Sequence, residues 1–78
     1  MMNGALLMVS KNKLGLNSDE IVDIIDLKML PENIEEIVDN EKYFFGYHMN
    51  KKHWITIILD GSVEIEKIYE LIDISYNL

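Results

Sequence analysis

The side chains best suited to recognise a ligand are concentrated in one stretch of the chain, residues 47–54. Aromatic rings, imidazoles, ammonium groups and an amide come together there, in Tyr47, His48, Asn50, Lys51, Lys52, His53 and Trp54. An aromatic face stacks on an unpaired base, and a cation beside it contacts a phosphate. The same combination anchors a partner protein. We therefore take these side chains as candidates for binding nucleic acid or a partner chain.

A purely structural explanation of the same residues stays open. Tyr47 and Trp54 also suit an aromatic pair packed across two strands at the edge of a core. Lys51 and Lys52 also keep a turn soluble and unpaired. The two histidines would then only form local hydrogen bonds, with some sensitivity to pH between about 5 and 8.

Catalysis and metal binding lack the residues that they need. His48 and His53 offer two nitrogens, but a catalytic zinc normally takes three protein ligands, and no spacing in the sequence offers a third. The sequence has no cysteine, no glycine-rich phosphate loop and no nucleophile elbow. We expect a chain that is not an enzyme and that uses neither a metal nor another cofactor.

A hairpin over residues 43–59 is expected to position the candidates. Its two strands, Phe44–Met49 and His53–Leu59, are rich in aromatic and β-branched residues. The residues between them, Asn50-Lys51-Lys52, are typical of a tight turn.

The length of this turn decides which side chains share a face, because side chains alternate along a strand. A turn made by Asn50 and Lys51 places Tyr47 directly opposite Trp54. The two histidines then also lie opposite each other. With an even loop Phe45 shares the Trp54 face, whereas an odd loop exchanges the faces of one strand.

The other elements follow from apolar periodicity and capping residues. Gly4–Ser10 is an apolar strand followed by a polar loop, and residues 20–28 form a second strand. Pro31 suits the first turn of a helix, which we expect over residues 31–39. Ser62 is expected to cap a final helix. The apolar stripe of that helix consists of Ile65, Ile68, Tyr69, Ile72 and Tyr76.

The resulting order is strand, strand, helix, strand, strand, helix. The simplest architecture is an α+β fold in which two helices pack on one antiparallel sheet, with β-β-α-β-β-α order. We expect residues 1–78 to form a single domain, because a chain of 78 residues holds only one hydrophobic core.

Composition restricts the class of protein further. Apolar residues make up 49% of the chain and charged residues 27%, which is enough apolar material for folding. The absence of cysteine favours a reducing cytoplasm, and no stretch approaches the about 20 apolar residues of a membrane span. The net charge is -7, and the sequence contains seven lysines and no arginine. Nucleic-acid binding would therefore need a local basic patch.

Several segments resemble the MmcQ/YjbR family, and they occur in the order of its C-terminal half. These segments are Gly46–Trp54, Leu59–Val63 and Leu71–Leu78. Leu27-Lys28 and Pro31-Glu32 resemble the strand-to-helix junction of that family, with Leu30 where an acidic residue is more usual. The resemblance covers most of the chain from residue 20 onward.

The resemblance implies a compact α+β fold similar to that of bacterial frataxin, and a DNA-binding role inferred from a double-wing shape. Members of the family usually carry a further helix and strand ahead of the matched region. We expect this chain to lack them and to be N-terminally short.

Two functions from different classes compete. The first is a small cytoplasmic binding domain of the MmcQ/YjbR type that contacts nucleic acid through residues 47–54. The alternative is a protein-interaction or assembly module with no nucleic-acid role, and an enzyme is a distant third. A shortened member would leave a sheet edge and one sheet face uncovered, so we also expect a homodimer or another protein partner.

Overall fold

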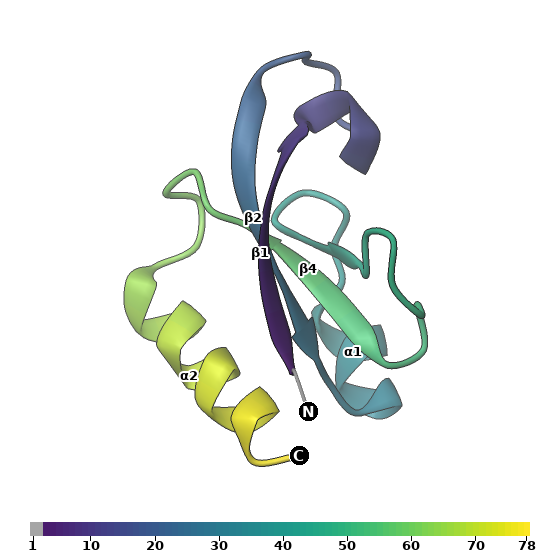
Figure 1. Cartoon of the computed structure of the whole chain (residues 1–78), viewed down its shortest axis with the longest axis vertical. Helices are drawn as coiled ribbons and strands as arrows, with labels where there is room; N and C mark the ends of the chain where they lie inside the picture. The colour runs from purple at the N-terminus through teal and green to yellow at the C-terminus, as the bar shows by residue number, and fades with distance from the viewer. Residues whose placement is uncertain (1–2) are drawn as a thin grey trace.

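The computed structural model describes residues 3–78, so the first two residues of the expected 1–78 domain lie outside the described part. The elements are β1 (Gly4–Ser10), the 3-10 turn η1 (Lys11–Leu14), β2 (Ile21–Lys28), α1 (Pro31–Ile37), β3 (Tyr43–Phe45), β4 (Trp54–Ile58) and α2 (Ile65–Tyr76). Figure 1 shows their arrangement. The predicted α+β fold with β-β-α-β-β-α order is confirmed. Within the described residues, the helices are too short or too polar to cross a membrane.

The four strands form one antiparallel sheet in the order β1-β2-β4-β3. β1 pairs with β2 along its whole length, from Gly4 opposite Leu27 to Ser10 opposite Ile21. β2 and β4 occupy the centre, whereas β1 and β3 are the two edges. In Figure 1, α2 lies along one side of the sheet, and the loops after β1 and β3 lie on the other side.

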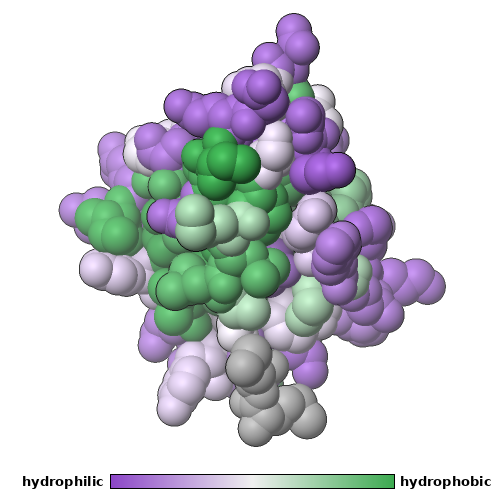
Figure 2. All heavy atoms as spheres, turned by 45° about the horizontal axis from the view of Figure 1, so that its top comes forward, coloured by the Kyte–Doolittle hydropathy of each residue, from purple (hydrophilic) through white to green (hydrophobic). Residues whose placement is uncertain are grey.

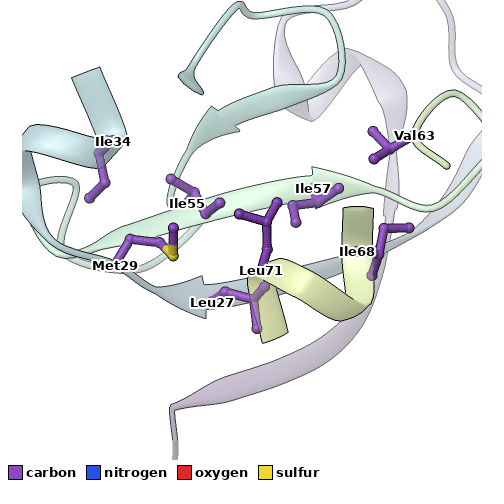
Figure 3. Close-up of a cluster of buried hydrophobic side chains, with 8 residues drawn as sticks. All are labelled: Leu27, Met29, Ile34, Ile55, Ile57, Val63, Ile68 and Leu71. Atoms are coloured by element: carbon purple, nitrogen blue, oxygen red, sulfur yellow. The ribbon is translucent and has the colours of Figure 1, made fainter. Parts of the chain in front are cut away.

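The first core lies between the sheet and the helices. Its buried side chains are Leu27, Met29, Ile34, Ile55, Ile57, Val63, Ile68 and Leu71 (Figure 3). Ile55 and Ile57 have no exposed surface. Because burying an aliphatic side chain of this size contributes about 1.5–3 kcal/mol, these central residues hold the helices on the sheet.

The buried face of α2 differs from the predicted apolar stripe. Tyr69 and Tyr76 are 64% and 81% exposed, whereas Leu71 and Ser75 point inward. The Ser75 hydroxyl donates to the carbonyl of Asn3 at 3.0 Å, and the Asn3 amide donates to the Ser75 carbonyl at 3.0 Å. This contact fixes the end of the helix to the start of β1. The prediction was wrong for the two tyrosines and for Ile65, which is 51% exposed.

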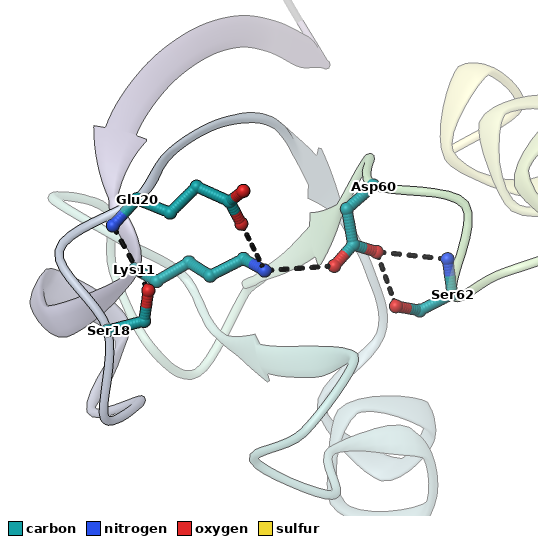
Figure 4. Close-up of polar contacts among 5 residues, drawn as sticks. All are labelled: Lys11, Ser18, Glu20, Asp60 and Ser62. Atoms are coloured by element: carbon teal, nitrogen blue, oxygen red, sulfur yellow. Dashed lines mark hydrogen bonds and ion pairs between the residues drawn. The ribbon is translucent and has the colours of Figure 1, made fainter.

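The turn between β4 and α2 is held by Asp60 and not by a Ser62 cap. Ser62 donates its hydroxyl and its backbone N–H, the latter at 2.9 Å, to the Asp60 carboxylate, and α2 begins only after Glu64. The same carboxylate lies 3.5 Å from the ammonium of Lys11, which also contacts Glu20 at 2.7 Å (Figure 4). The predicted cap is wrong, and the ion pairs instead attach the segment after β1 to the end of β4.

The opposite face of the sheet is closed by loops of the same chain. Its buried side chains are Val9, Val22, Ile24, Phe44 and Ile58. Leu14 and Leu16, from the segment after β1, and Tyr47, from the loop after β3, pack over them. The expectation that this face would stay bare was wrong, because the loops supply cover.

β3 and β4 are shorter than the strands of the predicted hairpin. Phe45 lies opposite Ile55, and Gly46 ends the pairing by donating its N–H to the Trp54 carbonyl at 3.0 Å. The chain then leaves the sheet. An odd number of residues separates Phe45 from its partner Ile55, so Phe45 shares the face of Ile55 and not that of Trp54. Tyr47 therefore does not lie opposite Trp54, and the prediction of a tight turn was wrong.

Replacing Gly46 with Ala tests this exit from the sheet. The added Cβ would lie 2.7 Å from the Trp54 Cβ and 3.1 Å from the Met49 Cβ, so the backbone must shift. We expect Gly46→Ala to lower the unfolding free energy, measured by urea titration, by about 1–3 kcal/mol. Gly4→Ala is the control, because its Cβ would meet the flexible end of Leu27 at 3.2 Å. Equal losses for the two variants would contradict the tight approach at Gly46.

Candidate functional site

Residues 46–53 connect β3 to β4, and we call them the 46–53 loop. Asn50 shapes this loop. The Asn50 side-chain oxygen accepts the N–H of Lys52 at 2.9 Å, and its carbonyl accepts the N–H of His53 at 3.2 Å. His48 has a φ of 58°, in the left-handed region that few residues other than glycine adopt. These local features make a defined turn, in which an Asn side chain replaces a backbone acceptor.

Most of the candidate side chains are exposed on this loop. The exposed ones are His48, Asn50, Lys51, Lys52 and His53. Tyr47 is half-buried and stacks on His48, with ring centroids 4.1 Å apart and an angle of 14° between the planes. The Lys51 ammonium donates to the Gly46 carbonyl at 2.9 Å. The structure brings the candidates together, but it engages Tyr47 and Lys51 within the loop.

The predicted pairs across the hairpin, Tyr47 with Trp54 and His48 with His53, do not form. Trp54 is half-buried at the start of β4, opposite Lys28 of β2, and the ring stack found in residues 3–78 joins Tyr47 to His48. His48 and His53 lie outside the strand pairing and are not opposite each other. Within the described residues, no group of three or more His, Cys, Asp or Glu side chains is placed to hold a metal ion.

A buried carboxylate connects the sheet to the 46–53 loop. Asp26 of β2 and its neighbour Thr56 of β4 have no exposed surface. The Thr56 hydroxyl donates to one Asp26 oxygen and accepts the N–H of Tyr47 at 2.8 Å. The other oxygen, Oδ2, has no hydrogen-bond partner among the described residues. Asp26 therefore holds the start of the loop through Thr56.

Burial raises the pKa of Asp26, because the charged form loses its hydration. The hydrogen bond from Thr56 and the positive charges of His48 and Lys51 act in the opposite direction but do not offset this cost. The sequence contained one signal for this residue, a carboxylate inside the apolar run Ile24–Leu27. The period of that run was ambiguous, so it did not show that Asp26 is buried.

The two lysines of the loop face an acidic helix across a hollow of about 340 Å³. The hollow is lined by Pro31, Ile34, Glu35, Phe45, Lys51 and Lys52. Glu32 and Glu36 are also exposed on α1. A polyanion that approached the lysines would therefore also meet carboxylates, which weakens its binding at ordinary salt.

A second candidate surface lies along the edge strand β1, and none of its residues was among the binding candidates predicted from the sequence. Leu6 and Met8 are each 71% exposed, Leu7 is 40% exposed, and Ile21, opposite Ser10, is 59% exposed. We call Leu6, Leu7, Met8 and Ile21 the β1 surface. Figure 2 shows a continuous hydrophobic patch with a hydrophilic border on the side where β1 faces the viewer.

Two hollows with mostly apolar linings adjoin the β1 surface. One, of about 650 Å³, lies where Leu6, Leu7 and Met8 approach Leu59. The other, of about 590 Å³, separates the start of β1 from α2 and includes Tyr76 in its lining. The surface is therefore grooved and can receive side chains of another molecule.

Comparison with known proteins identifies the family. The family model described as YjbR matches residues 5–78. The chain belongs to the YjbR family. It is 39% identical over 75 residues to the uncharacterized protein YyaQ of Bacillus subtilis (strain 168), a match that covers 96% of this chain and 64% of YyaQ. It is also 55% identical over 30 residues to the uncharacterized protein YjbR of Escherichia coli (strain K12), which is 38% of this chain and 25% of that protein. The predicted resemblance is confirmed.

Solved structures of a Pseudomonas syringae protein share this YjbR-family fold. The crystal structure superimposes with a TM-score of 0.87 at 38% identity over 94% of this chain, and the NMR structure with 0.86 at 36% identity over 99%. Both matches cover 62% of that protein. The chain thus spans less than two thirds of these relatives, and none of their names states an activity.

We expect Asp26→Asn to remove a pH dependence of stability. The raised pKa means that the folded chain holds this proton more tightly than the unfolded chain does. The stabilisation that Asp26 contributes is therefore fully present below pH 3.8, which is the ordinary pKa of an aspartate. It is lost as the pH rises through the raised pKa of the folded chain. Urea denaturation from about pH 4 to pH 8 should show wild type losing stability relative to the variant.

The difference in unfolding free energy between wild type and Asp26→Asn isolates the contribution of Asp26. Asp39 and Asp60 have lowered pKa values, so their stabilisation is present above 3.8 and is lost as the pH falls. Both carboxylates are present in wild type and in the variant, so their contributions cancel. A difference in unfolding free energy that does not change with pH would contradict the raised pKa of Asp26.

Proposed function

We propose that this YjbR-family domain is a protein-interaction module and not an enzyme, and that the β1 surface is where its partner docks. The observation that carries the proposal is the edge strand itself, which exposes three large apolar side chains in succession, Leu6, Leu7 and Met8. Single exposed apolar residues are ordinary on proteins. A contiguous apolar patch on an unpaired strand marks an interaction site.

β1 lacks the features by which edge strands usually avoid pairing. Gly4–Ser10 contains no charged residue and no proline, and its register with β2 runs without a bulge. The other edge strand, β3, has only three residues, and a short strand is itself a protection. β1 is therefore the edge that can accept a further strand.

The energetics require a partner that covers more than two side chains. Full burial of Leu6 and Met8 contributes about 1.5–3 kcal/mol each. Association costs about 4–15 kcal/mol in lost rotational and translational freedom. A partner must therefore also fill the neighbouring hollows and satisfy the free backbone groups, with a contact of about 800 Å² on each side.

Nucleic-acid contact through the 46–53 loop is the second candidate function. The observation in its favour is the exposure of Lys51 and Lys52 beside the stacked rings of Tyr47 and His48. The net charge of -7 and the glutamates of α1 oppose it. We therefore rank it below protein docking and expect any such binding to be weak and sensitive to salt.

Replacing Lys51 and Lys52 with Glu tests this second candidate. If the loop contacts phosphates, the double variant should bind single-stranded DNA at least about tenfold more weakly at low salt, with a salt slope reduced by about 1.4. Fluorescence titration at several salt concentrations measures both quantities. Lys13→Glu combined with Lys67→Glu makes the same change of charge elsewhere and is the control. Undiminished binding by the loop variant would remove the 46–53 loop from nucleic-acid recognition.

Site-specific photo-crosslinking in cells tests the docking proposal. A photoreactive amino acid at position 6 or 8 should give discrete protein adducts, because a partner covers these side chains. The same amino acid at Glu32, which is exposed on α1, is the control and should give at least about fivefold less adduct if the contact is specific to β1. Adducts of equal yield at all three positions, or none at 6 and 8, would contradict docking on the β1 surface.

A further inference from the structure

We propose that the partner is a second copy of this chain, and that the two β1 strands pair antiparallel about a twofold axis at Leu7. This inference rests on the proposed function, since it names the occupant of the β1 surface. The loops cover the sheet face that was expected to be bare. The second copy would instead pair with the outer backbone edge of β1, which has no partner strand within residues 3–78.

The pairing of β1 with β2 shows which backbone groups are free. Lys28 donates its N–H to the Asn3 carbonyl at 2.9 Å, and Lys11 donates its N–H to the Glu20 carbonyl at 2.9 Å. Hydrogen-bonded and non-bonded pairs alternate along an antiparallel ladder, so the odd-numbered residues between Asn3 and Lys11 bond to β2. The amide and carbonyl groups that point out of the sheet belong to Gly4, Leu6, Met8 and Ser10.

A second β1 strand supplies the same row of groups at the same spacing. With the axis at Leu7, Leu6 lies opposite Met8 of the partner subunit, and the two residues exchange backbone hydrogen bonds. This register uses the whole strand, because Leu7 is the central residue of Gly4–Ser10. The exposed Leu6 and Met8 side chains of both copies then meet on one face of the joined sheet.

Charge does not prevent this contact, although each chain carries -7. Gly4–Ser10 has no charged side chain, and the following Lys11 is already paired with Glu20 and Asp60. Two carboxylates of β2 lie opposite β1, and of these Asp26 is buried whereas Asp23, opposite Met8, is exposed. The two β1 strands would separate the two copies of Asp23 by at least about 14 Å, which exceeds the screening length of about 8 Å at physiological salt.

A single engineered cysteine tests the register, because the chain contains none of its own. At the axis, Leu7 would face its counterpart as a non-bonded pair with Cα atoms about 4.5 Å apart, within the range of a disulfide. Leu7→Cys should therefore give a covalent dimer on a non-reducing gel after mild oxidation. Ala5→Cys is the matched control on the same strand and face. Its two copies would be about 14 Å apart, beyond the reach of a disulfide.

Light scattering coupled to size exclusion tests the assembly of the unmodified chain. We expect about twice the 9.1 kDa chain mass at micromolar concentration, and the single-chain mass for Leu6→Glu combined with Met8→Glu. Circular dichroism of the double variant checks that it is folded. Because both side chains are 71% exposed, the substitution leaves the core intact.

The outcomes separate this inference from the proposed function. A wild-type dimer together with crosslinking of Leu7→Cys, but not of Ala5→Cys, supports the inference. A mass of one chain that stays unchanged on tenfold concentration overturns it, and so does equal crosslinking of the two cysteine variants. A monomeric chain whose positions 6 and 8 photo-crosslink to a different protein also overturns it but leaves the docking function standing.

Discussion

The central strand β4 must be buried on both faces, and the rest of the structure depends on this constraint. Ile55 and Ile57 are sealed under the helices, and Thr56 is sealed on the opposite face. α1 and α2 cover the first face, and the segment after β1 and the 46–53 loop cover the second. Within residues 3–78, the helices and loops cover mainly the centre of the sheet. Among the described residues, nothing pairs with the outer edge of β1, which keeps exposed apolar side chains and one row of free backbone groups.

The same constraint explains why the 46–53 loop is a weaker candidate site than its composition suggests. The loop is part of the cover of the second core, through the packing of Tyr47 and the hydrogen bonds from Tyr47 to Thr56 and from Thr56 to Asp26. Within the loop, the Tyr47 ring also stacks on His48, and the Lys51 ammonium donates to the Gly46 carbonyl. Both side chains therefore already have partners in the loop. The outer side of β1 packs on no other element in residues 3–78, so its exposed surface is available for another molecule.

The order of the elements could be predicted from the sequence, because alternation and helical spacing are local properties, and the strand Gly4–Ser10 has its predicted bounds. The loop after β3 could not be predicted, since it depends on the close approach of Gly46 to Trp54. The burial of Asp26 follows from the central place of β2, which alternation does not reveal. The exposure of β1 likewise follows from strand order, which is set by tertiary packing.

The central claim is that a second strand occupies the free edge of β1. Amide hydrogen exchange resolved by residue tests it most directly, because the edge amides of Leu6 and Met8 alternate along the strand with the amides of Leu7 and Val9, which bond to β2. At tens of micromolar chain, we expect Leu6 and Met8 to be protected to a similar degree as Leu7 and Val9, and to lose that protection on dilution. Fast exchange of Leu6 and Met8 at every concentration, with Leu7 and Val9 protected, would show that the edge is open and would contradict the claim.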